Sequence, residues 1–468
     1  MNRLQRNIPH LFDNIGKYKP FTENVVIWLG LRAADYSMIN FMDPNIIMST
    51  RYGKDDIFLE QKFPLISTEK NTKKRTDSSL DELDFYLDDT LKFLSSLKDI
   101  SSFLICYHST PVIEKKVAQY PNIKILNPPS YLKNYLDKKT VVREHLKNLG
   151  IPMVPGLEGK LCKDTFEFSA KKYGLPLFIQ FDDSASGSGS HIVENAPQFN
   201  ELYDENKNQQ AIFMKYIEGK SLNINAVKTR NFVILSEPSL QIIGQPECTT
   251  RKFGYCGNDF NVSSKLSDEQ FKEISNITKK IGDWMGLINY LGVFGIDFMV
   301  DNEKVYFIEI NPRFQGSTSL LIDRQMELGK VPLSLFHIVP FMDNIYIDPN
   351  SVEDYNHFNA PLNVSQLLLH NISNKDATIE SQLNPGRYKF EDDKLIYLGP
   401  AQFLSQTKSY NEILIAGDIP LNGTTVLKDS DEICRVYSYK EVLDKNGINL
   451  NAFGKDLVKN IYSSFNLK

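Results

Sequence analysis

The sequence has little that would link the protein to a membrane, to nucleic acid or to an oxidising compartment. No apolar run approaches the roughly 18 residues that a membrane-spanning helix needs, and the first residues lack the apolar core of a signal peptide. The net charge is -5, and no basic stripe of the kind that binds nucleic acid stands out. The five cysteines are an odd number without CxxC spacing, which argues against a disulfide framework. We therefore expect a cytoplasmic protein that has neither nucleic acid nor a membrane as a partner.

The first part of the chain has the pattern of an α/β domain. The 468 residues are enough for about three subdomains of ordinary size. Short apolar runs at 25–29, 103–107 and 123–126 predict strands, and leucines at helical spacing over 80–94 predict an amphipathic helix. We expect residues 1–128 to form this N-terminal α/β domain.

The middle of the chain alternates helices and strands, and the end is rich in strands. A helix is predicted at 137–149, because Gly150 stands where a C-terminal cap belongs, and another begins after Ser267. Strands are predicted at 175–181, 191–193 and 211–217. Residues 346–468 carry short alternating runs between turn residues and end in a predicted helix at 454–466. We expect them to form a strand-rich C-terminal domain.

Two carboxylates interrupt a predicted hairpin of otherwise apolar strands at 295–300 and 305–311. Because side chains alternate along a strand, Asp297, Glu309 and Asn311 should share one face, with Arg313 just beyond. Such an oxygen set beside a cation suits Mg²⁺, which takes one or two carboxylates together with substrate phosphates. Spacing alone leaves a second interpretation open, in which these side chains form a solvated polar face.

The hairpin sequence GIDFMVDNEKVYFIEINPRFQG resembles the metal-binding signature of ATP-grasp enzymes, the superfamily of biotin carboxylase and D-alanine–D-alanine ligase. Asp297, Glu309, Asn311 and Arg313 match every position of that signature. The resemblance implies an ATP-grasp fold of mixed α/β class over residues 129–345, with a lid subdomain at about 140–215. It also implies ATP and Mg²⁺ as cofactors, with Mn²⁺ as an alternative ion, and makes Asp297, Glu309 and Asn311 the metal ligands.

Three other segments resemble the nucleotide-binding parts of that family. KTVVREHLKNLG resembles the entry to the lid, whose phosphate-binding lysine is Lys139 by spacing, with Lys138 as the competitor. SASGSGS resembles the lid loop, in which small residues let backbone N–H groups approach phosphate oxygens. AIFMKYIEGK resembles the strand that holds adenine. The resemblance assigns nucleotide contacts to Lys139, Gln180, Ser186, Gly187, Ser188, Gly189, Met214, Lys215, Tyr216, Ile217 and Ser221.

The sequence departs from the family pattern at two of these positions. Gln180 stands where the lid strand usually offers a lysine to phosphate, and Ser221 stands where a glutamate usually binds the ribose. A glutamine can donate hydrogen bonds, but it cannot neutralise phosphate charge. Since the metal-binding face is complete, we interpret both changes as marks of a subfamily. A catalytically idle nucleotide-binding or regulatory protein is the alternative.

The resemblance implies a ligase that activates a carboxylate as an acyl phosphate for attack by an amine. Arg313 is the candidate to hold the carboxylate or the acyl phosphate, because its guanidinium pairs bidentately with oxyanions. Residues 244–260 are predicted to form one long loop, whose Arg251, Lys252 and Asn258 would line the acceptor or phosphate pocket, with a simple surface loop as the alternative. Arg251 is, with Arg313, a candidate catalytic residue. Ser317 stands in place of the catalytic glutamate of biotin carboxylase, which argues against that reaction.

The expected partners are small-molecule carboxylate and amine substrates. An amino acid or a peptide of specialised metabolism fits the resemblance best, with amide or peptide bond formation as the reaction. Transfer of the acyl group to a carrier protein is an alternative. The oligomeric state is left open, with a homodimer among the alternatives.

Overall fold

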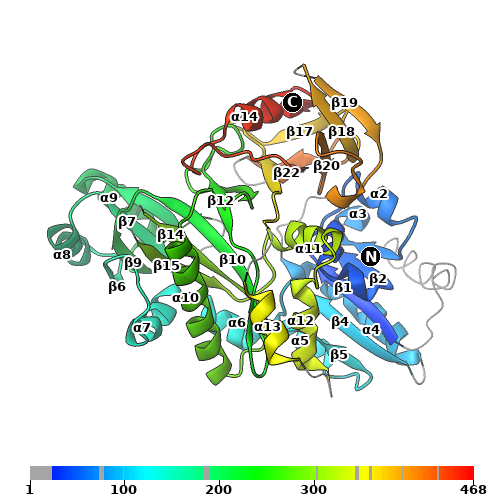
Figure 1. The fold of residues 1–468 in the computed structure, drawn as a ribbon, viewed down its shortest axis with the longest axis horizontal. Helices are drawn as coiled ribbons and strands as arrows, with labels where there is room; N and C mark the ends of the chain where they lie inside the picture. Colours follow the sequence, from blue (N-terminus) through cyan, green and yellow to red (C-terminus); the bar gives the residue numbers. More distant parts are fainter. Residues whose placement is uncertain are drawn as a thin grey trace.

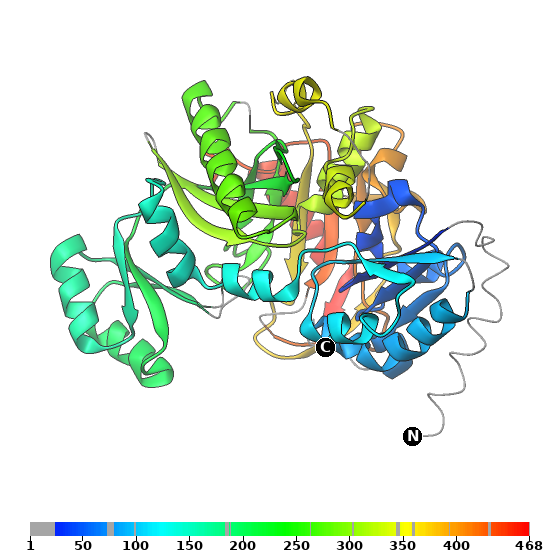
Figure 2. The same ribbon diagram turned by 90° about the horizontal axis from the view of Figure 1, so that it is seen from below.

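The computed structural model describes residues 24–72, 79–97, 100–182, 187, 189–262, 264–301, 304–342, 347–357, 361–392, 394–428 and 432–467. In Figure 1 a lid projects at the left, the N-terminal sheet lies at the lower right, and the C-terminal strands lie at the top. Seen from below in Figure 2, the lid and the N-terminal sheet stand at opposite ends of the molecule.

The N-terminal sheet has five parallel strands in the order β3-β2-β1-β4-β5. The strands are β1 (Asn24–Gly30), β2 (Ile46–Ser49), β3 (Leu65–Ser67), β4 (Ser101–Cys106) and β5 (Ile123–Ile125). The connecting helices are η2 (Ala33–Met42), α2 (Asp56–Leu59), α3 (Thr68–Thr72), η3 (Leu80–Leu83), α4 (Asp84–Ser96) and α5 (Pro111–Val117). The strand order reverses between β1 and β4, and open parallel sheets bind ligands beyond the carboxyl ends of the strands at such a point.

The predicted N-terminal elements are present, with one change in helix type. The leucine stripe is buried as predicted, but its first turn is the 3₁₀ helix η3 and only the rest is α-helical. Ser79 caps this turn by accepting a hydrogen bond from the backbone N–H of Asp81 at 3.3 Å. The α/β character predicted for this part of the chain is confirmed.

Two helices, α6 (Ser130–Leu136) and α7 (Lys139–Asn148), lead into the lid. Gly150 follows α7 with a φ of 68°, a left-handed conformation that glycine adopts without strain. The lid sheet is antiparallel in the order β6-β9-β7-β8. Its elements are β6 (Gly156–Lys160), α8 (Lys163–Tyr173), β7 (Leu177–Phe181), β8 (Ser190–Val193), α9 (Ala196–Asn206) and β9 (Gln210–Lys215). A small core of its own holds the lid together, with the rings of Phe166 and Phe199 stacked at 4.2 Å.

A large sheet of eleven strands forms the centre of the molecule, in the order β15-β14-β10-β12-β13-β16-β22-β20-β18-β19, with β11 beside β10. Its first strands are β10 (Lys220–Lys228), β11 (Val233–Leu235), β12 (Ser239–Ile243), β13 (Tyr255–Asp259), β14 (Gly292–Val300) and β15 (Val305–Asn311). The others are β16 (Ser365–His370), β18 (Gly386–Glu391), β19 (Lys394–Gly399), β20 (Glu412–Ala416) and β22 (Glu432–Ser438). The pairing of β13 with β16 joins the C-terminal strands to those of the middle of the chain.

The hairpin predicted at 295–311 is confirmed as β14 and β15. The prediction of one long loop over 244–260 is wrong at its end, because residues 255–259 form β13. The helix predicted after Ser267 is α10 (Asp268–Leu287), and Ser267 and Gln270 form the capping box that the sequence indicates. Figure 1 shows α10 lying along the large sheet.

The remaining elements complete the body of the molecule. They are α11 (Thr318–Glu327), α12 (Leu333–Ile338), η4 (Val339–Phe341), α13 (Pro349–Tyr355), η5 (Leu404–Gln406), α14 (Ala452–Tyr462) and a small sheet of β21 (Thr425–Val426), β17 (Ala377–Ser381) and β23 (Phe465–Leu467). Helix α12 contacts both η2 and strand β10, and it thereby joins the N-terminal part to the large sheet. In the part of the chain described, no helix has the length and apolarity to cross a bilayer, and all five cysteines are unpaired thiols.

Candidate active site

The two acids of the hairpin face each other in the structure. Asp297 lies opposite Glu309 in the register of β14 and β15, with a β-bulge directly after Asp297. The Nδ2 of Asn311 donates to Asp297 Oδ2 at 3.2 Å. On the other side, Asn223 of β10 lies opposite Asp297 and donates through Nδ2 to its Oδ1 at 2.6 Å. The strand pairing therefore brings the three predicted metal ligands together, with Asn223 as an unpredicted fourth polar side chain.

The electrostatics of this pair suit a divalent cation. Burial, and after it the Glu309 carboxylate, raise the pKa of Asp297, while hydrogen bonds from Asn223, Gln241 and Asn311 oppose the rise. Two carboxylates in one buried place repel each other, and a bound cation relieves that repulsion. No group of three or more His, Cys, Asp or Glu side chains with metal-binding geometry occurs among the described residues. Two carboxylates and an amide oxygen fit Mg²⁺, which completes its shell with water and phosphate oxygens.

Lys139 and Gln180 approach the same pair from the lid side. Lys139 Nζ lies 3.6 Å from Glu309 Oε2, and Gln180 Nε2 donates to the same oxygen at 3.3 Å. Asp182 fixes the start of α7, because its carboxylate accepts from the backbone N–H and the hydroxyl of Thr140 at 2.8 and 2.7 Å. Lys138 is exposed, so Lys139 is the lysine that the structure directs into the site.

An apolar slot lies beside these polar groups, between the lid and the hairpin. It is lined by Val154, Phe178 and Met214 from the lid side and by Ile308 from β15. Lys215, Tyr216, Ile217 and Ser221, from the predicted adenine-holding segment, line the same cavity. The backbone N–H groups of Lys215 and Tyr216 donate to the carbonyls of Pro155 and Pro176, at 2.9 and 3.3 Å. These two residues therefore offer side chains and carbonyls to a ligand, rather than N–H donors.

The tip of the lid meets the loop that precedes β13. Gly187 has a φ of 77°, and a Cβ there would stand 2.0 Å from the carbonyl oxygen of Phe253. The ring of Phe253 packs edge-on against Phe178 at 5.3 Å. The Gly189 carbonyl accepts from the Phe181 N–H at 3.0 Å, whereas Ser186 and Ser188 lie outside the described residues. The lid and this loop thus close over the slot together.

Arg313 lies beyond the metal ligands, on the side away from the slot. Its guanidinium donates to the Tyr107 hydroxyl at 3.1 Å, to the Phe314 carbonyl at 3.0 Å and to Asn311 Oδ1 at 3.3 Å. Burial lowers the pKa of Arg313, but Tyr107 and three nearby carboxylates outweigh burial and raise it above its ordinary value. The guanidinium therefore stays charged at this end of the site.

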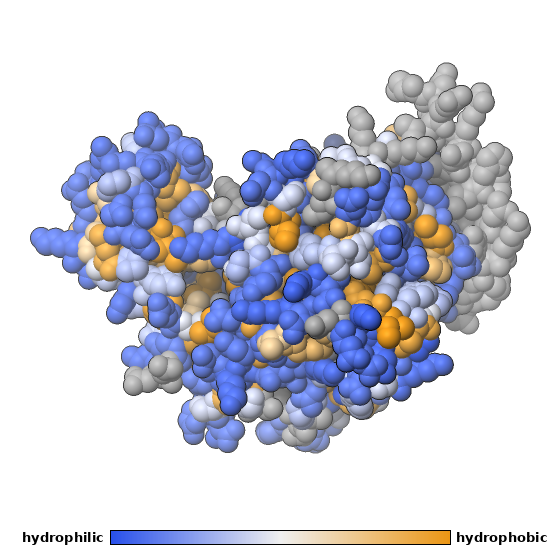
Figure 3. Space-filling view, turned by 90° about the horizontal axis from the view of Figure 1, so that it is seen from above, coloured by the Kyte–Doolittle hydropathy of each residue, from blue (hydrophilic) through white to orange (hydrophobic). Residues whose placement is uncertain are grey.

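Asp297, Glu309, Asn311, Gln180, Arg313 and the residues of the slot border one cavity of about 590 Å³, and Lys139 lies beside it through its contact with Glu309. Arg251 and Lys252, predicted from the sequence, line the same cavity, together with Asn258 of β13. The space-filling view in Figure 3 shows the surface hollowed between the lid and the body of the molecule.

Sequence reasoning missed several residues that line the same cavity. They are Arg32, Arg51, Tyr107, Asn223, His370, Glu432 and Arg435. Arg32, Arg51 and Tyr107 follow the carboxyl ends of parallel strands, and that position is the signal that could have found them. Ser317 is buried, and its hydroxyl donates to Asn223 Oδ1 at 3.1 Å and accepts from Asn225 Nδ2 at 3.0 Å. The place of the biotin carboxylase acid therefore holds a neutral hydrogen-bond network.

Comparison with known proteins agrees with this geometry. A model of the ATP-grasp domain family matches residues 136–317. Pyruvate carboxylase of Bacillus subtilis is 25% identical over 205 residues, which are 41% of this chain and 17% of that protein. Formate-dependent phosphoribosylglycinamide formyltransferase of Prochlorococcus marinus is 28% identical over 154 residues, which are 31% of this chain and 36% of that protein. The chain thus spans well under half of the length of these relatives.

Among solved structures, the biotin carboxylase domain of 2-oxoglutarate carboxylase from Hydrogenobacter thermophilus has a similar fold. It superposes with a TM-score of 0.61 at 13% sequence identity, covering 96% of this chain and 91% of that one. That structure contains MgADP, ADP and bicarbonate. At this identity the likeness concerns the fold, which extends over nearly the whole chain.

Proposed function

We propose that the protein, whose residues 136–317 form an ATP-grasp domain, is an ATP-dependent ligase that joins a carboxylate to an amine and releases ADP and phosphate. One observation carries the proposal. Asp297, Glu309 and Asn311 converge between an apolar slot on one side and Arg313 on the other, in a single cavity. The slot fits a nucleotide base, the acids fit Mg²⁺ on its phosphates, and Arg313 fits the carboxylate that receives phosphate.

The proposed reaction has two steps, and the chain's own residues position both. A carboxylate oxygen of the substrate bonds to the γ-phosphorus, and the bond from that phosphorus to the β–γ bridging oxygen breaks, which yields ADP. The amine nitrogen then bonds to the acyl carbon, phosphate leaves and the nitrogen loses a proton. Asp297, Glu309 and Asn311 would hold Mg²⁺, which supplies charge neutralisation on the transferring group. Arg313, held by Tyr107 and Asn311, would orient the carboxylate.

Nucleotide phosphates would meet Lys139 and Gln180 on the lid side. Both side chains already reach Glu309 and lie where Mg²⁺-bound phosphates would stand. Gln180 is 6% exposed, and its Oε1 has no hydrogen-bond partner among the described residues. A buried acceptor of this kind calls for a donor, which a water beside the phosphates would supply. Ser221, in place of the usual glutamate, would face the ribose.

For the substrates we propose an amino acid or a peptide as the acid and an amino compound as the acceptor, in specialised metabolism. The neutral network around Ser317 supports an amine acceptor over the carboxylation of biotin, because it leaves no acid there. An acceptor held on a carrier protein and assembly as a homodimer are further proposals. Mass spectrometry of products and size-exclusion chromatography test them.

ADP release measured against a panel of amino acids, singly and in pairs, with mass spectrometry of the products, tests the proposed function. The expected result is ADP release that requires both an acid and an amine and gives a product one water lighter than their sum. ATP binding without turnover by any pair would instead favour the catalytically idle protein that Gln180 and Ser221 suggest. A product carboxylated on nitrogen, with bicarbonate as the acid, would contradict an amino acid or a peptide as the acid substrate.

A further inference from the structure

The far part of the cavity, beyond Arg313, is lined by an arginine wall, which consists of Arg32, Arg51 and Arg435 from three separate segments. Gly30 at the end of β1 lies beside Ser49 at the end of β2. Arg32 and Arg51 each follow two residues later, so the parallel register brings them out side by side at the carboxyl edge of the sheet. The backbone keeps this register past the strands, because the Arg51 N–H donates to the Leu31 carbonyl at 2.9 Å. Both side chains line the cavity.

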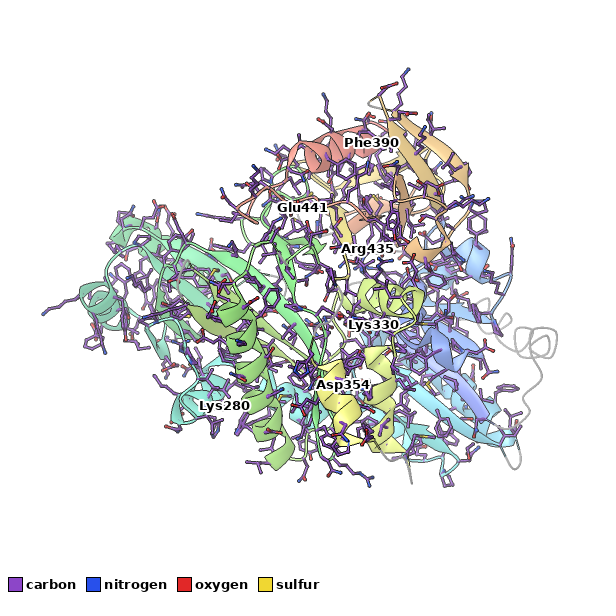
Figure 4. The ribbon with its side chains drawn as sticks, in the orientation of Figure 1. Lys280, Lys330, Asp354, Phe390, Arg435 and Glu441 are labelled. Carbon is purple, nitrogen blue, oxygen red and sulfur yellow. The ribbon has the colours of Figure 1, made fainter. Side chains whose placement is uncertain are left out.

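The third arginine, Arg435 of β22, lines the same cavity. Figure 4 shows it below the C-terminal strands, toward the N-terminal part of the molecule. Glu432 links two of the three: Arg32 lies 3.0 Å from it, and Arg435 pairs with it as well. Burial raises the pKa of Glu432, but Arg435 and Arg32 outweigh burial and lower it to about 2, so the carboxylate stays charged. Because the guanidiniums are held by ion pairs, they form a fixed wall.

The charges of the cavity are unequal. Outside Asp297 and Glu309, Glu432 is the only acid among the described lining residues. The cations there are Arg32, Arg51 and Arg435 together with Lys215, Arg251, Lys252 and Arg313, seven in all. Behind the wall, Asp35 pairs with Arg32 at 3.0 Å and Asp418 pairs with Arg51 at 2.6 Å.

Counting these two with the three lining acids, and Lys139 beside Glu309 with the cations, gives five acids against eight cations, an excess of three positive charges. Mg²⁺ ions largely balance the negative charge of ATP, so the excess positive charge of the protein is left for the acid substrate. The carboxylate that reacts beside Arg313 accounts for one charge.

We propose that the arginine wall binds a second anionic group on the acid substrate, so that the ligase selects acids with two oxyanionic groups. This inference rests on the proposed function, because it concerns the acid of the same reaction. Guanidinium groups bind carboxylate and phosphate oxygens alike. The second group is therefore a carboxylate or a phosphate ester. Acids of the same length with a neutral amide or hydroxyl in that place leave the wall without a partner.

Calorimetry tests the inference without turnover, in the presence of Mg²⁺ and a non-hydrolysable ATP analogue. Glutamate is compared with glutamine, aspartate with asparagine, and phosphoserine with serine. We expect the dianionic member of at least one pair to bind about tenfold or more tightly than its neutral partner, the range for a hydrogen bond to a charged group. The pair that shows the difference identifies carboxylate or phosphate as the group. Equal binding within every pair overturns the inference, even if ADP release establishes the ligase.

Two variants separate recognition by Arg51 from a purely structural role. Arg51→Gln removes the charge and should reduce the preference for the dianion toward equality. Asp418→Asn keeps Arg51 and removes its acidic partner, so the preference should stay or increase. A structural role predicts instead that both variants weaken binding of both ligands alike. Arg230→Gln, an exposed arginine that donates to the Pro340 carbonyl, is the control and should behave as wild type. An Arg51→Gln protein that folds and keeps the full preference contradicts the proposal.

Discussion

Replacing Gln180 or Lys139 by alanine should weaken ATP binding to different extents. Gln180 offers a neutral amide that already reaches Glu309 at 3.3 Å. Its net contribution is about 0.5–1.5 kcal/mol, so Gln180→Ala should raise the Kd for ATP about 2- to 12-fold. Lys139 brings a charge to the same oxygen, and its side chain is 8% exposed. A charged hydrogen bond contributes about 1.5–3 kcal/mol, which predicts a rise of about 12- to 150-fold for Lys139→Ala.

Calorimetry with a non-hydrolysable ATP analogue, at one salt and magnesium concentration, measures both variants. Lys138→Ala is the matched control, because Lys138 is the preceding lysine and is exposed. It should bind the analogue nearly as wild type does. If Gln180→Ala proves more damaging than Lys139→Ala, this division of roles between the two side chains is wrong.

Three further predictions concern the metal, the lid and the pH range. Glu309→Gln should lower the rate of ADP release by orders of magnitude, since it removes one charge that would hold Mg²⁺, and should leave the unfolding temperature near that of wild type. A near-normal rate of ADP release would exclude this role for Glu309. Gly187→Ala should weaken nucleotide binding, because the added Cβ would strike the Phe253 carbonyl. Gly174→Ala is the control: its φ is 82° and the added Cβ has no atom within 4 Å, so it strains the backbone alone and should bind nucleotide normally. Burial lowers the pKa of His337 from 6.5 to about 4. The unfolded chain therefore binds a proton there before the folded protein does, and the fold loses stability, about 3 kcal/mol at most, as the pH falls from 6.5 toward 4. Thermal unfolding from pH 7 to pH 4 should therefore depend less on pH in His337→Asn than in wild type.

The parts of the site that the sequence could predict are those encoded by local patterns. Asp297 and Glu309 each interrupt an apolar strand, and only four residues separate the two paired strands in the sequence, so their convergence follows from alternation. The buried leucine stripe of η3 and α4 and the glycine that ends α7 are equally local signals. Secondary-structure propensity and hydrophobic periodicity depend on residues that are close along the chain. The hairpin acids, the leucine stripe and the terminating glycine could be predicted because each depends only on such neighbours.

The rest of the site depends on contacts between segments far apart in the sequence. Arg32 and Glu432 are 400 positions apart, and they meet only because β13 pairs with β16 and carries the C-terminal strands back to the N-terminal sheet. No local pattern marks Arg51 as part of a pocket, since its position follows from the parallel register of β1 and β2. The contact between Gly187 and Phe253 likewise joins the lid to a loop that was predicted only as a long connection.

Transfer of oxygen from the acid substrate to phosphate tests the central claim most directly. An acid labelled with ¹⁸O in its carboxylate is incubated with ATP, Mg²⁺ and the amine, and the released phosphate is analysed by mass spectrometry. If the carboxylate attacks the γ-phosphorus, each phosphate released carries one ¹⁸O from the acid. Phosphate without label, or label found in AMP instead, would contradict activation as an acyl phosphate in this cavity.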